Sequence, residues 1–347
     1  MKWPAPSPSA RAIEMEASPS ADVRAAATVE PVARVTAPVA APTFTFVIPA
    51  YNEADDIVMT LECALAQRLR PHEIIVVDDG STDGTLEKLH RLRDNGLIVV
   101  IEHGQNRGAA AARNTAIAAA TGDVLVFVDA DNWPPVDFLE RLAPLYQEGF
   151  DFVSVESRVA NQQNVIGRFQ QAKHAHCYGG ARRGRVGYTQ AFSCRRTAAI
   201  AVGFPEQLPG FGGEDVEFFD RLLRSGYAWK GDFSIEVLNQ VPDTLRDFWC
   251  QYRGRGKAVP YIEYRLKGWP LPLVTARRTL AAVKSMAVAV AVVPHAQTAV
   301  RMSKHSARGW RDVPAFWMLQ NMLYAAHRAG EWQSLRRLWR EKRGATP

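Results

Sequence analysis

Four short apolar runs, each followed by polar residues, constrain the fold of this chain most. They are FTFVIPA (44–50), EIIVVDD (73–79), LIVVIEH (97–103) and DVLVFVDAD (123–131). Each is rich in β-branched residues and nearly continuous in apolar character, which is typical of strands buried on both faces. Segments of helical period lie between them. This alternation predicts an α/β fold of Rossmann type, with a mainly parallel sheet flanked by helices.

The composition indicates a folded protein with one distinct terminal segment. The chain has 347 residues, 47% of them apolar, which suffices for one large domain or two smaller ones. Residues 1–42 consist mainly of Ala, Pro, Ser and Val without a sustained period. Such a segment buries too little apolar surface to offset its ordering entropy. We therefore expect a flexible tail over residues 1–42.

Cysteine usage and the first residues bear on the compartment. The four cysteines are scattered without a C-x-x-C pair, which favours reduced thiols in a cytoplasmic setting. The first twenty residues lack the apolar stretch of a secretory signal peptide. The expected localisation is therefore cytoplasmic.

Basic residues concentrate in the C-terminal third. Residues 251–347 contain 18 Lys and Arg against 4 Asp and Glu, in a chain of net charge +6. Two segments there, 279–293 and 313–343, mix apolar and aromatic residues with Arg and Lys, and the first is shorter than the ~20 apolar residues of a spanning helix. We expect this region to contact an anionic membrane surface peripherally, on the inner face of the cell membrane. The alternative is a set of helices packed on the α/β domain with a solvated basic face, and no nucleic-acid partner is expected.

Acidic residues gather where the predicted strands end. Ligands of such sheets bind beyond the carboxyl ends of the strands, where this chain has Tyr51-Asn52-Glu53, Asp78-Asp79 and Asp129-x-Asp131. Two side chains two residues apart on a strand share a face, so Asp129 and Asp131 would raise each other's pKa. A divalent cation such as Mg²⁺ or Mn²⁺ removes that penalty and usually enters with substrate phosphates. Neither a G-x-G-x-x-G dinucleotide motif nor a P-loop is present.

A second acidic pair precedes an amphipathic helix. The stretch GFGGEDVEFFDRLLRSGY (210–227) predicts an amphipathic helix. Four of its side chains are expected to face the core: Val216, Phe219, Leu222 and Leu223. Glu214 and Asp215 would lie at its N-terminus, where the helix dipole favours negative charge. An ionised carboxylate there can act as a general base. Simple N-capping is the alternative.

Taken together, these motifs resemble family 2 glycosyltransferases of the GT-A fold. The matching stretches are FVIPAYNEADDI, IIVVDDGSTDGT, GQNRGAAAARNTAI with ATGDVLVFVDADN, and GGEDVEFFDRLLRSGY, in this order from about residue 43 to about residue 226. The resemblance implies a GT-A catalytic domain over residues 43–245, with a nucleotide-binding half (43–132) and an acceptor half (133–245). A helical, basic region over residues 246–347 would follow.

The resemblance also implies roles for single residues. On the donor side three residues would line the nucleoside pocket, namely Pro49, Tyr51 and Glu53. Asp79 would hold the base of the nucleotide.

The remaining roles concern the diphosphate and the acceptor. Asp129 would hold the ribose or bridge to the metal, and Asp131 would ligate Mn²⁺ or Mg²⁺ on the diphosphate. Arg113 would steady these carboxylates or the phosphates. Asp215 would deprotonate the acceptor hydroxyl.

The expected function is an inverting, metal-assisted glycosyltransferase that moves a sugar from a nucleotide-diphospho-sugar to a hydroxyl of an unknown acceptor, such as a lipid-linked or envelope-polysaccharide intermediate. Membrane synthases of this family carry Q-x-x-R-W near the position of Gln251, and this pattern is not matched here. One alternative is a nucleotidyltransferase, which normally has a Gly-rich basic loop where this chain has the acidic PAYNEADD. The other is a non-catalytic nucleotide-sugar-binding protein, which would have no need of a base.

Overall fold

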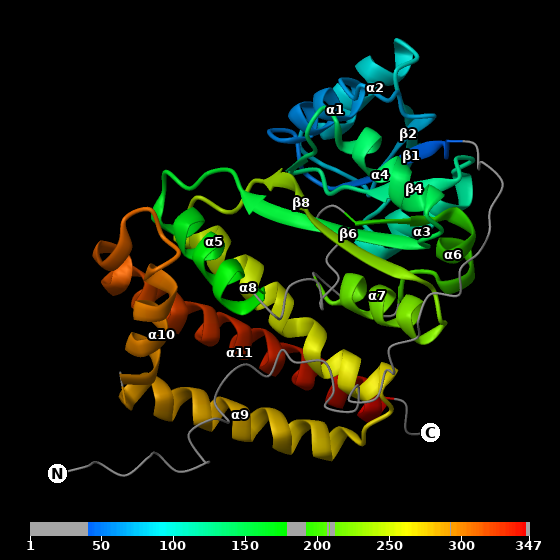
Figure 1. Ribbon diagram of the computed structural model, residues 1–347. Helices are drawn as coiled ribbons and strands as arrows, with labels where there is room; N and C mark the ends of the chain where they lie inside the picture. The colour runs from blue at the N-terminus through cyan, green and yellow to red at the C-terminus, as the bar shows by residue number, and fades with distance from the viewer. Residues whose placement is uncertain (1–40, 179–191, 207, 209–211, 292, 345–347) are drawn as a thin grey trace. The chain divides into compact units, whose positions relative to one another are not determined.

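The computed structural model of the chain describes residues 41–178, 192–206, 208, 212–291 and 293–344 (Figure 1). The chain divides into two units, Met1–Val39 and Ala40–Pro347. All described residues belong to the second unit, which holds both the sheet and the C-terminal helices. The predicted flexible tail lies almost wholly outside the described residues.

The described residues form an eight-stranded sheet in the order β3-β2-β1-β4-β7-β6-β8-β5. Its strands are β1 (Phe44–Ala50), β2 (Glu73–Asp78), β3 (Val99–Glu102), β4 (Val124–Phe127), β5 (Asn132–Trp133), β6 (Phe152–Val159), β7 (Phe192–Arg195) and β8 (Trp229–Asn239). β1 pairs in parallel with β2 and β4, and β2 with β3, so the four predicted strands are neighbours. β7 runs antiparallel between β4 and β6, and β6 is parallel to β8. The predicted mainly parallel α/β sheet is confirmed.

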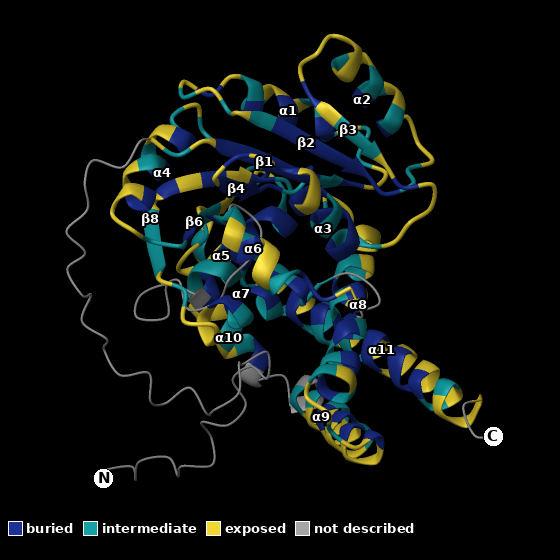
Figure 2. Ribbon diagram, turned by 90° about the vertical axis from the view of Figure 1, so that its right-hand side faces the viewer, coloured by how far each residue is buried: buried dark blue, intermediate teal, exposed yellow. Residues whose placement is uncertain are grey.

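Two of the strands differ from the sequence prediction. β4 ends at Phe127, so Asp129 and Asp131 lie in the turn that follows and not on the strand itself. β3 is not buried on both faces, because it forms the edge of the sheet, and Val99 is 46% exposed. The central strands, in contrast, are buried along almost their whole length (Figure 2).

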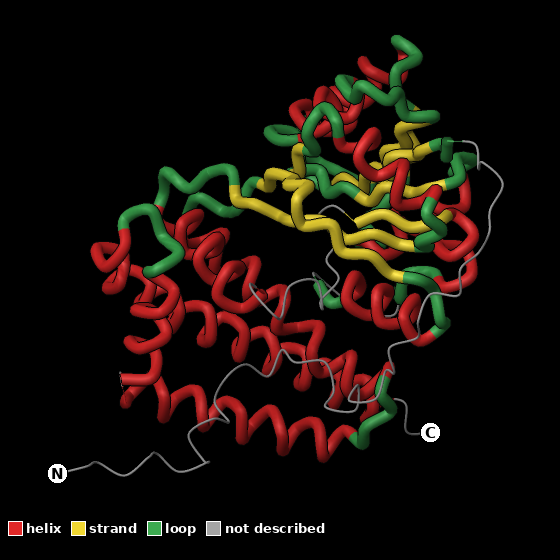
Figure 3. The backbone as a smooth tube through the Cα atoms, viewed as in Figure 1, coloured by secondary structure: helices red, strands yellow, loops and turns green. Residues whose placement is uncertain are grey.

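Helices cover both faces of the sheet (Figure 3). Those on one face are α1 (Ile57–Leu65), α2 (Thr85–Asp94) and α4 (Phe138–Gln147), and those on the other are α3 (Ala109–Ala119), α6 (Arg196–Val202) and α7 (Glu214–Arg224). In α7, Phe218, Phe219 and Leu222 are buried, whereas Leu223 is 43% exposed. The inward position predicted for Leu223 is therefore wrong, since the phenylalanine pair, packed on Phe127 and Phe152, sets which side of α7 faces the sheet.

The C-terminal region is helical, as predicted. Its elements are α8 (Leu245–Tyr261), the π-helix η3 (Ile262–Leu266), α9 (Leu271–Ala291), α10 (Val293–Ser303), the 3₁₀ helix η4 (Gly309–Asp312) and α11 (Val313–Gly344). The earlier helix α5 (Val165–Tyr178) packs against this group. α8 and α11 touch through their backbones, because a Cβ on Gly256 would lie 2.0 Å from the carbonyl oxygen of His327 and one on Gly330 would lie 2.0 Å from that of Arg253. Throughout the described ranges, no helix combines the length and the hydrophobicity needed to cross a bilayer.

Candidate functional site

The loops that follow β1 and β2 are tied together at the carboxyl edge of the sheet. Asn52, whose φ is 56°, accepts a hydrogen bond from the Thr82 N–H through Oδ1 at 2.7 Å. The Asn52 N–H in turn donates to Ser81 Oγ at 3.0 Å. Of the three residues predicted for the nucleoside pocket, Pro49 lies near the end of β1, and Tyr51 and Glu53 lie in the loop that follows. These residues therefore lie next to the acidic loop after β2.

Asp79 is buried and fully engaged in holding a neighbouring loop. Its Oδ1 accepts the Arg107 N–H at 2.9 Å and lies 2.8 Å from Nδ1 of His103, and its Oδ2 accepts the Gly108 N–H at 2.7 Å. His103 ends the predicted third strand, and its Nε2 lies 2.9 Å from Thr115 Oγ1. These contacts give Asp79 a structural task, so its role in binding the base stays a prediction.

Asp78 has one carboxylate oxygen without a donor, a feature that its sequence position does not predict. Its Oδ2 accepts the N–H groups of Gly80 at 3.1 Å and Ser81 at 3.0 Å, which caps the turn. Its Oδ1 is buried and has no hydrogen-bond donor within the described part of the chain. A buried carboxylate oxygen without a donor is costly, so Asp78 is a better candidate than Asp79 for an incoming N–H or O–H.

Three carboxylates around the turn after β4 repel one another. Burial raises the pKa of Asp131 well above its usual range, and the charges of Asp129 and Glu53 raise it further. Burial also raises the pKa of Glu53 to about 7, with contributions from Asp56 and Asp129. The cluster thus concentrates negative charge where little water screens it.

Arg113 joins this cluster to the start of α7. Its guanidinium is buried, and donates from Nη2 to Asp129 Oδ1 at 2.6 Å and from Nη1 to Glu214 Oε1 at 3.0 Å. It also lies over the ring of Phe204, with 5.3 Å from Cζ to the ring centroid. Arg113 thus contacts two carboxylates, and its role in steadying carboxylates or phosphates during the reaction stays a prediction. Glu214 could not be predicted as a partner of Arg113 from the sequence, because the two residues are 101 positions apart.

Asp215 begins α7 beside Glu214, but its electrostatics differ from the expectation. Burial, followed by the negative charge of Glu214, raises the pKa of Asp215 to about 7, although Arg113 lowers it. The helix dipole is therefore outweighed by desolvation and a like charge. A carboxylate with a pKa of about 7 is still suited to accept a proton near neutral pH.

The carboxylates of the acidic cluster could supply some of the ligands of a divalent cation, with the remaining ligands coming from a substrate. Across the described ranges, no three His, Cys, Asp or Glu side chains form a ready-made metal site. Mg²⁺ and Mn²⁺, however, are often held by one or two carboxylates together with phosphate oxygens of a substrate. The raised pKa of Asp131 beside Asp129 is the condition that such a cation relieves.

Part of the chain matches a known protein family. Residues 45–203 match the family described as Glycosyl transferase family 2. A poly-beta-1,6-N-acetyl-D-glucosamine synthase of Staphylococcus aureus is 28% identical over 221 residues, which are 60% of this chain and 52% of that protein. Glycosyltransferase AglE of Haloferax volcanii is 31% identical over 195 residues, 54% of this chain and 63% of that protein. The chain thus spans about half the length of the synthase.

A solved structure shows the same fold. The mannosyltransferase PcManGT of Pyrobaculum calidifontis, in complex with GDP-Man and Mn²⁺, superimposes with a TM-score of 0.56 at 21% identity, covering 86% of this chain and 88% of that chain. The expected GT-A fold is confirmed. The residues that match Glycosyl transferase family 2, 45–203, include the acidic loops, the paired aspartates and Arg113.

Proposed function

We propose that the chain is an inverting, metal-assisted glycosyltransferase that moves a sugar from a nucleotide-diphospho-sugar to an acceptor hydroxyl. One observation carries the proposal. Arg113 binds Asp129 in the turn after β4 and Glu214 at the start of α7, so that the proposed metal-binding carboxylates and the proposed base, Asp215, belong to one connected cluster.

In this proposal the residues of the cluster divide the chemistry between them. Asp131, with Asp129, would hold a divalent cation, which when bound stabilises negative charge on the leaving diphosphate. Asp215 takes the proton of the acceptor hydroxyl while that oxygen attacks the anomeric carbon. The bond from the anomeric carbon to the diphosphate breaks on the opposite side, so the configuration inverts. Arg113 keeps Asp129 and Glu214 in place during the reaction.

The nucleoside is assigned to the joined loops after β1 and β2. Pro49, Tyr51 and Glu53 would line its pocket, and Asp78 Oδ1 would accept an N–H or O–H from it. GDP-Man is the donor bound to PcManGT, and the staphylococcal relative is named for a polymer of N-acetylglucosamine. Guanosine- and uridine-diphosphate sugars are therefore the donors to test first.

The acceptor is assigned by analogy alone. Because a relative is a polysaccharide synthase, we propose a lipid-linked or envelope-polysaccharide hydroxyl. The unmatched Q-x-x-R-W pattern favours addition of single sugars over processive polymerisation. The cytoplasmic location expected from the sequence, at the inner face of a membrane, stays a prediction.

A donor-turnover assay tests the proposal. The protein is incubated with a panel of nucleotide sugars, with and without Mn²⁺, and the released nucleotide is identified. Mn²⁺-dependent release of a nucleoside diphosphate supports glycosyl transfer. Pyrophosphate formation would instead identify a nucleotidyltransferase, and tight donor binding without turnover by any donor or acceptor would favour a non-catalytic binding protein.

A further inference from the structure

The helix α9 has two opposite faces of different character. The inner face is buried and includes Leu271, Val274 and Ala281. At 100° per residue the opposite face carries a stripe of large apolar side chains that are 54% to 68% exposed: Leu273, Leu280, Val283 and Met286. The cationic residues Arg277 and Lys284 are exposed along one border of this stripe, which we call the α9 outer stripe.

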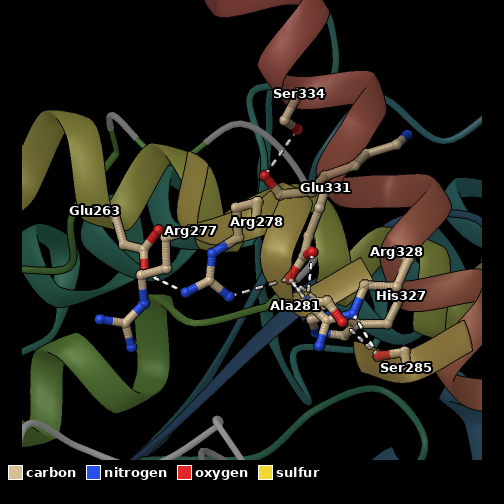
Figure 4. Close-up of polar contacts among 10 residues, drawn as sticks. Glu263, Arg277, Arg278, Ala281, Ser285, His327, Arg328, Glu331 and Ser334 are labelled. Carbon is tan, nitrogen blue, oxygen red and sulfur yellow. Dashed lines mark hydrogen bonds and ion pairs between the residues drawn. The ribbon is translucent and has the colours of Figure 1, made fainter. Parts of the chain in front are cut away.

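The inner face is held in place by buried charges (Figure 4). Arg278 of α9 pairs with Glu331 of α11 at 3.3 Å and with Glu263 of η3. Ser285 of α9 accepts a hydrogen bond from Nε of Arg328 at 3.2 Å. Because these contacts come from one side only, they fix which side of α9 faces outward.

Every acidic residue of the C-terminal region forms an ion pair with a basic residue of the protein. Residues 251–347 contain four of them, against 18 Lys and Arg. Each has basic partners: Glu263 with Arg277 and Arg278, Asp312 with Arg168, Glu331 with Arg278 and Arg328, and Glu341 with Arg265 and Arg337. The sequence of α9 itself contains no Asp or Glu. The excess of basic residues therefore remains as net positive charge, with no acidic side chain on α9 to offset it.

We infer that the α9 outer stripe docks on an anionic lipid bilayer, with its apolar side chains in the headgroup–acyl boundary and Lys284 at the headgroups. Arg277, which also pairs with Glu263 at 3.5 Å, lies on the same border. An apolar stripe bordered by cations fits a surface that is both apolar and anionic. A second copy of the chain would bring two strongly basic regions together, which like-charge repulsion opposes. Nucleic acid supplies phosphates but no apolar phase for Leu280 and Met286. Docking requires neither donor nor acceptor, so it goes beyond the proposed reaction and does not depend on it.

Vesicle flotation of the full chain tests this inference. We expect binding to vesicles of phosphatidylcholine with 30% phosphatidylglycerol at low salt, and weak binding to phosphatidylcholine alone. The double variant Leu280→Asp/Val283→Asp should lower the partition coefficient about tenfold or more, because two apolar contacts become charged. Lys284→Gln, a milder surface change, should lower it about fivefold, and high salt should remove that difference.

A matched control separates the stripe from general hydrophobicity. Ile200 of α6 is 54% exposed, against 55% for Leu280, and lies on the catalytic domain. Ile200→Asp should leave vesicle binding unchanged, and circular dichroism should show that all variants are folded. The inference is overturned if the wild type does not bind anionic vesicles, if the double variant binds as well as the wild type, or if the wild type is a dimer that the double variant converts to a monomer.

Discussion

The carboxylates at the carboxyl ends of the strands are buried near other acids, whereas Asp312 and Glu331 among the C-terminal helices are buried near arginines. At the sheet edge, burial and neighbouring acids raise the pKa of Glu53 to about 7 and that of Asp131 well above its usual range. Among the helices, the hydrogen bond from Arg168 lowers the pKa of Asp312. Burial acts to raise the pKa of Glu331 as well, but its basic neighbours outweigh this and lower it.

This difference in pKa distinguishes carboxylates that stabilise the fold through ion pairs from carboxylates that we propose bind a ligand. For Asp312 and Glu331, arginines of the protein complete the ion pairs and lower the pKa. Glu263 is the exception in this region, because burial raises its pKa despite its contacts with Arg277 and Arg278. At the sheet edge Arg113 compensates the acidic cluster only in part. A buried charge that the protein leaves uncompensated is costly, so the proposed divalent cation would relieve this cost at the acidic cluster.

The largest expected effect is on the proposed base. Asp215→Asn should lower the rate of sugar transfer about 10³-fold, within the range for loss of a general base, and leave donor affinity nearly unchanged. Asp220→Asn, on the same helix, is the control and should transfer sugar at close to the wild-type rate. Single-turnover assays with isothermal titration of the donor measure both quantities. Wild-type transfer by the Asp215 variant would remove the base from the proposal.

The next largest expected effect concerns the buried ion pairs among the C-terminal helices. Glu331→Gln leaves Arg278 and Arg328 without their shared carboxylate in the helical core. The free energy of unfolding should fall by about 3–5 kcal/mol, as for other broken buried pairs. Glu341→Gln, at a more exposed pair, should cost about 1 kcal/mol or less. Denaturant titration of both variants measures the difference, and equal losses would contradict it.

Asp131→Asn should change stability in the opposite direction. Because burial and the charges of Asp129 and Glu53 raise the pKa of Asp131, ionisation of this group opposes folding. The neutral Asn should therefore raise the melting temperature at pH 8 by about 2 °C or more. The same variant should abolish the increase in melting temperature that Mn²⁺ gives to the wild type. A lower melting temperature for Asp131→Asn, as expected of Glu331→Gln, would break the comparison between the two regions.

The dependence on pH follows from the raised pKa values. Glu53 and Asp215 each have a folded-state pKa of about 7, above their ordinary values, so the folded state binds more protons than the unfolded state. Their contribution to stability is full below about pH 4 and is lost as the pH rises through about 7. The stability of Glu53→Gln relative to the wild type should therefore increase from pH 5 to pH 8 without metal. A difference that shrinks with pH would contradict the sign.

The same titration predicts a rising rate profile. Since Asp215 must be ionised to accept a proton, the transfer rate at saturating donor should increase with pH through about 7. Bound metal, being positive, should move the midpoint lower. A rate that falls over this interval would indicate that Asp215 acts in its protonated form.

The smallest effect separates the two adjacent aspartates. Asp78→Asn should weaken donor affinity about tenfold, because a buried acceptor would be replaced by a poorer one. Asp79→Asn should mainly lower the melting temperature, since Asp79 holds His103 and the loop before α3. Donor titration and thermal unfolding of both variants test this, and the reverse assignment would restore the role first predicted for Asp79.

Much of the fold could be predicted because strand and helix patterns are local. The run 44–50 coincides with β1, and the run 73–79 exceeds β2 by one residue. The fourth run, 123–131, extends beyond β4, which ends at Phe127. The chain turns there because the Asn132 N–H donates to the Asp129 carbonyl at 3.1 Å and because β5 pairs with β8. The edge position of β3 was also unpredictable, since apolar character does not reveal which strand has a neighbour on one side only.

Local sequence patterns were enough to predict the first strands, the carboxylates at their ends and the acidic pair that begins α7. They could not predict which of these carboxylates have hydrogen-bond donors, because that depends on how the chain folds. Asp79 is occupied by a loop some 24 to 29 residues further on, and Glu214 is held by an arginine 101 residues away. The physical reason is that periodicity depends on neighbours along the chain, whereas burial and the interaction between charges depend on neighbours in space.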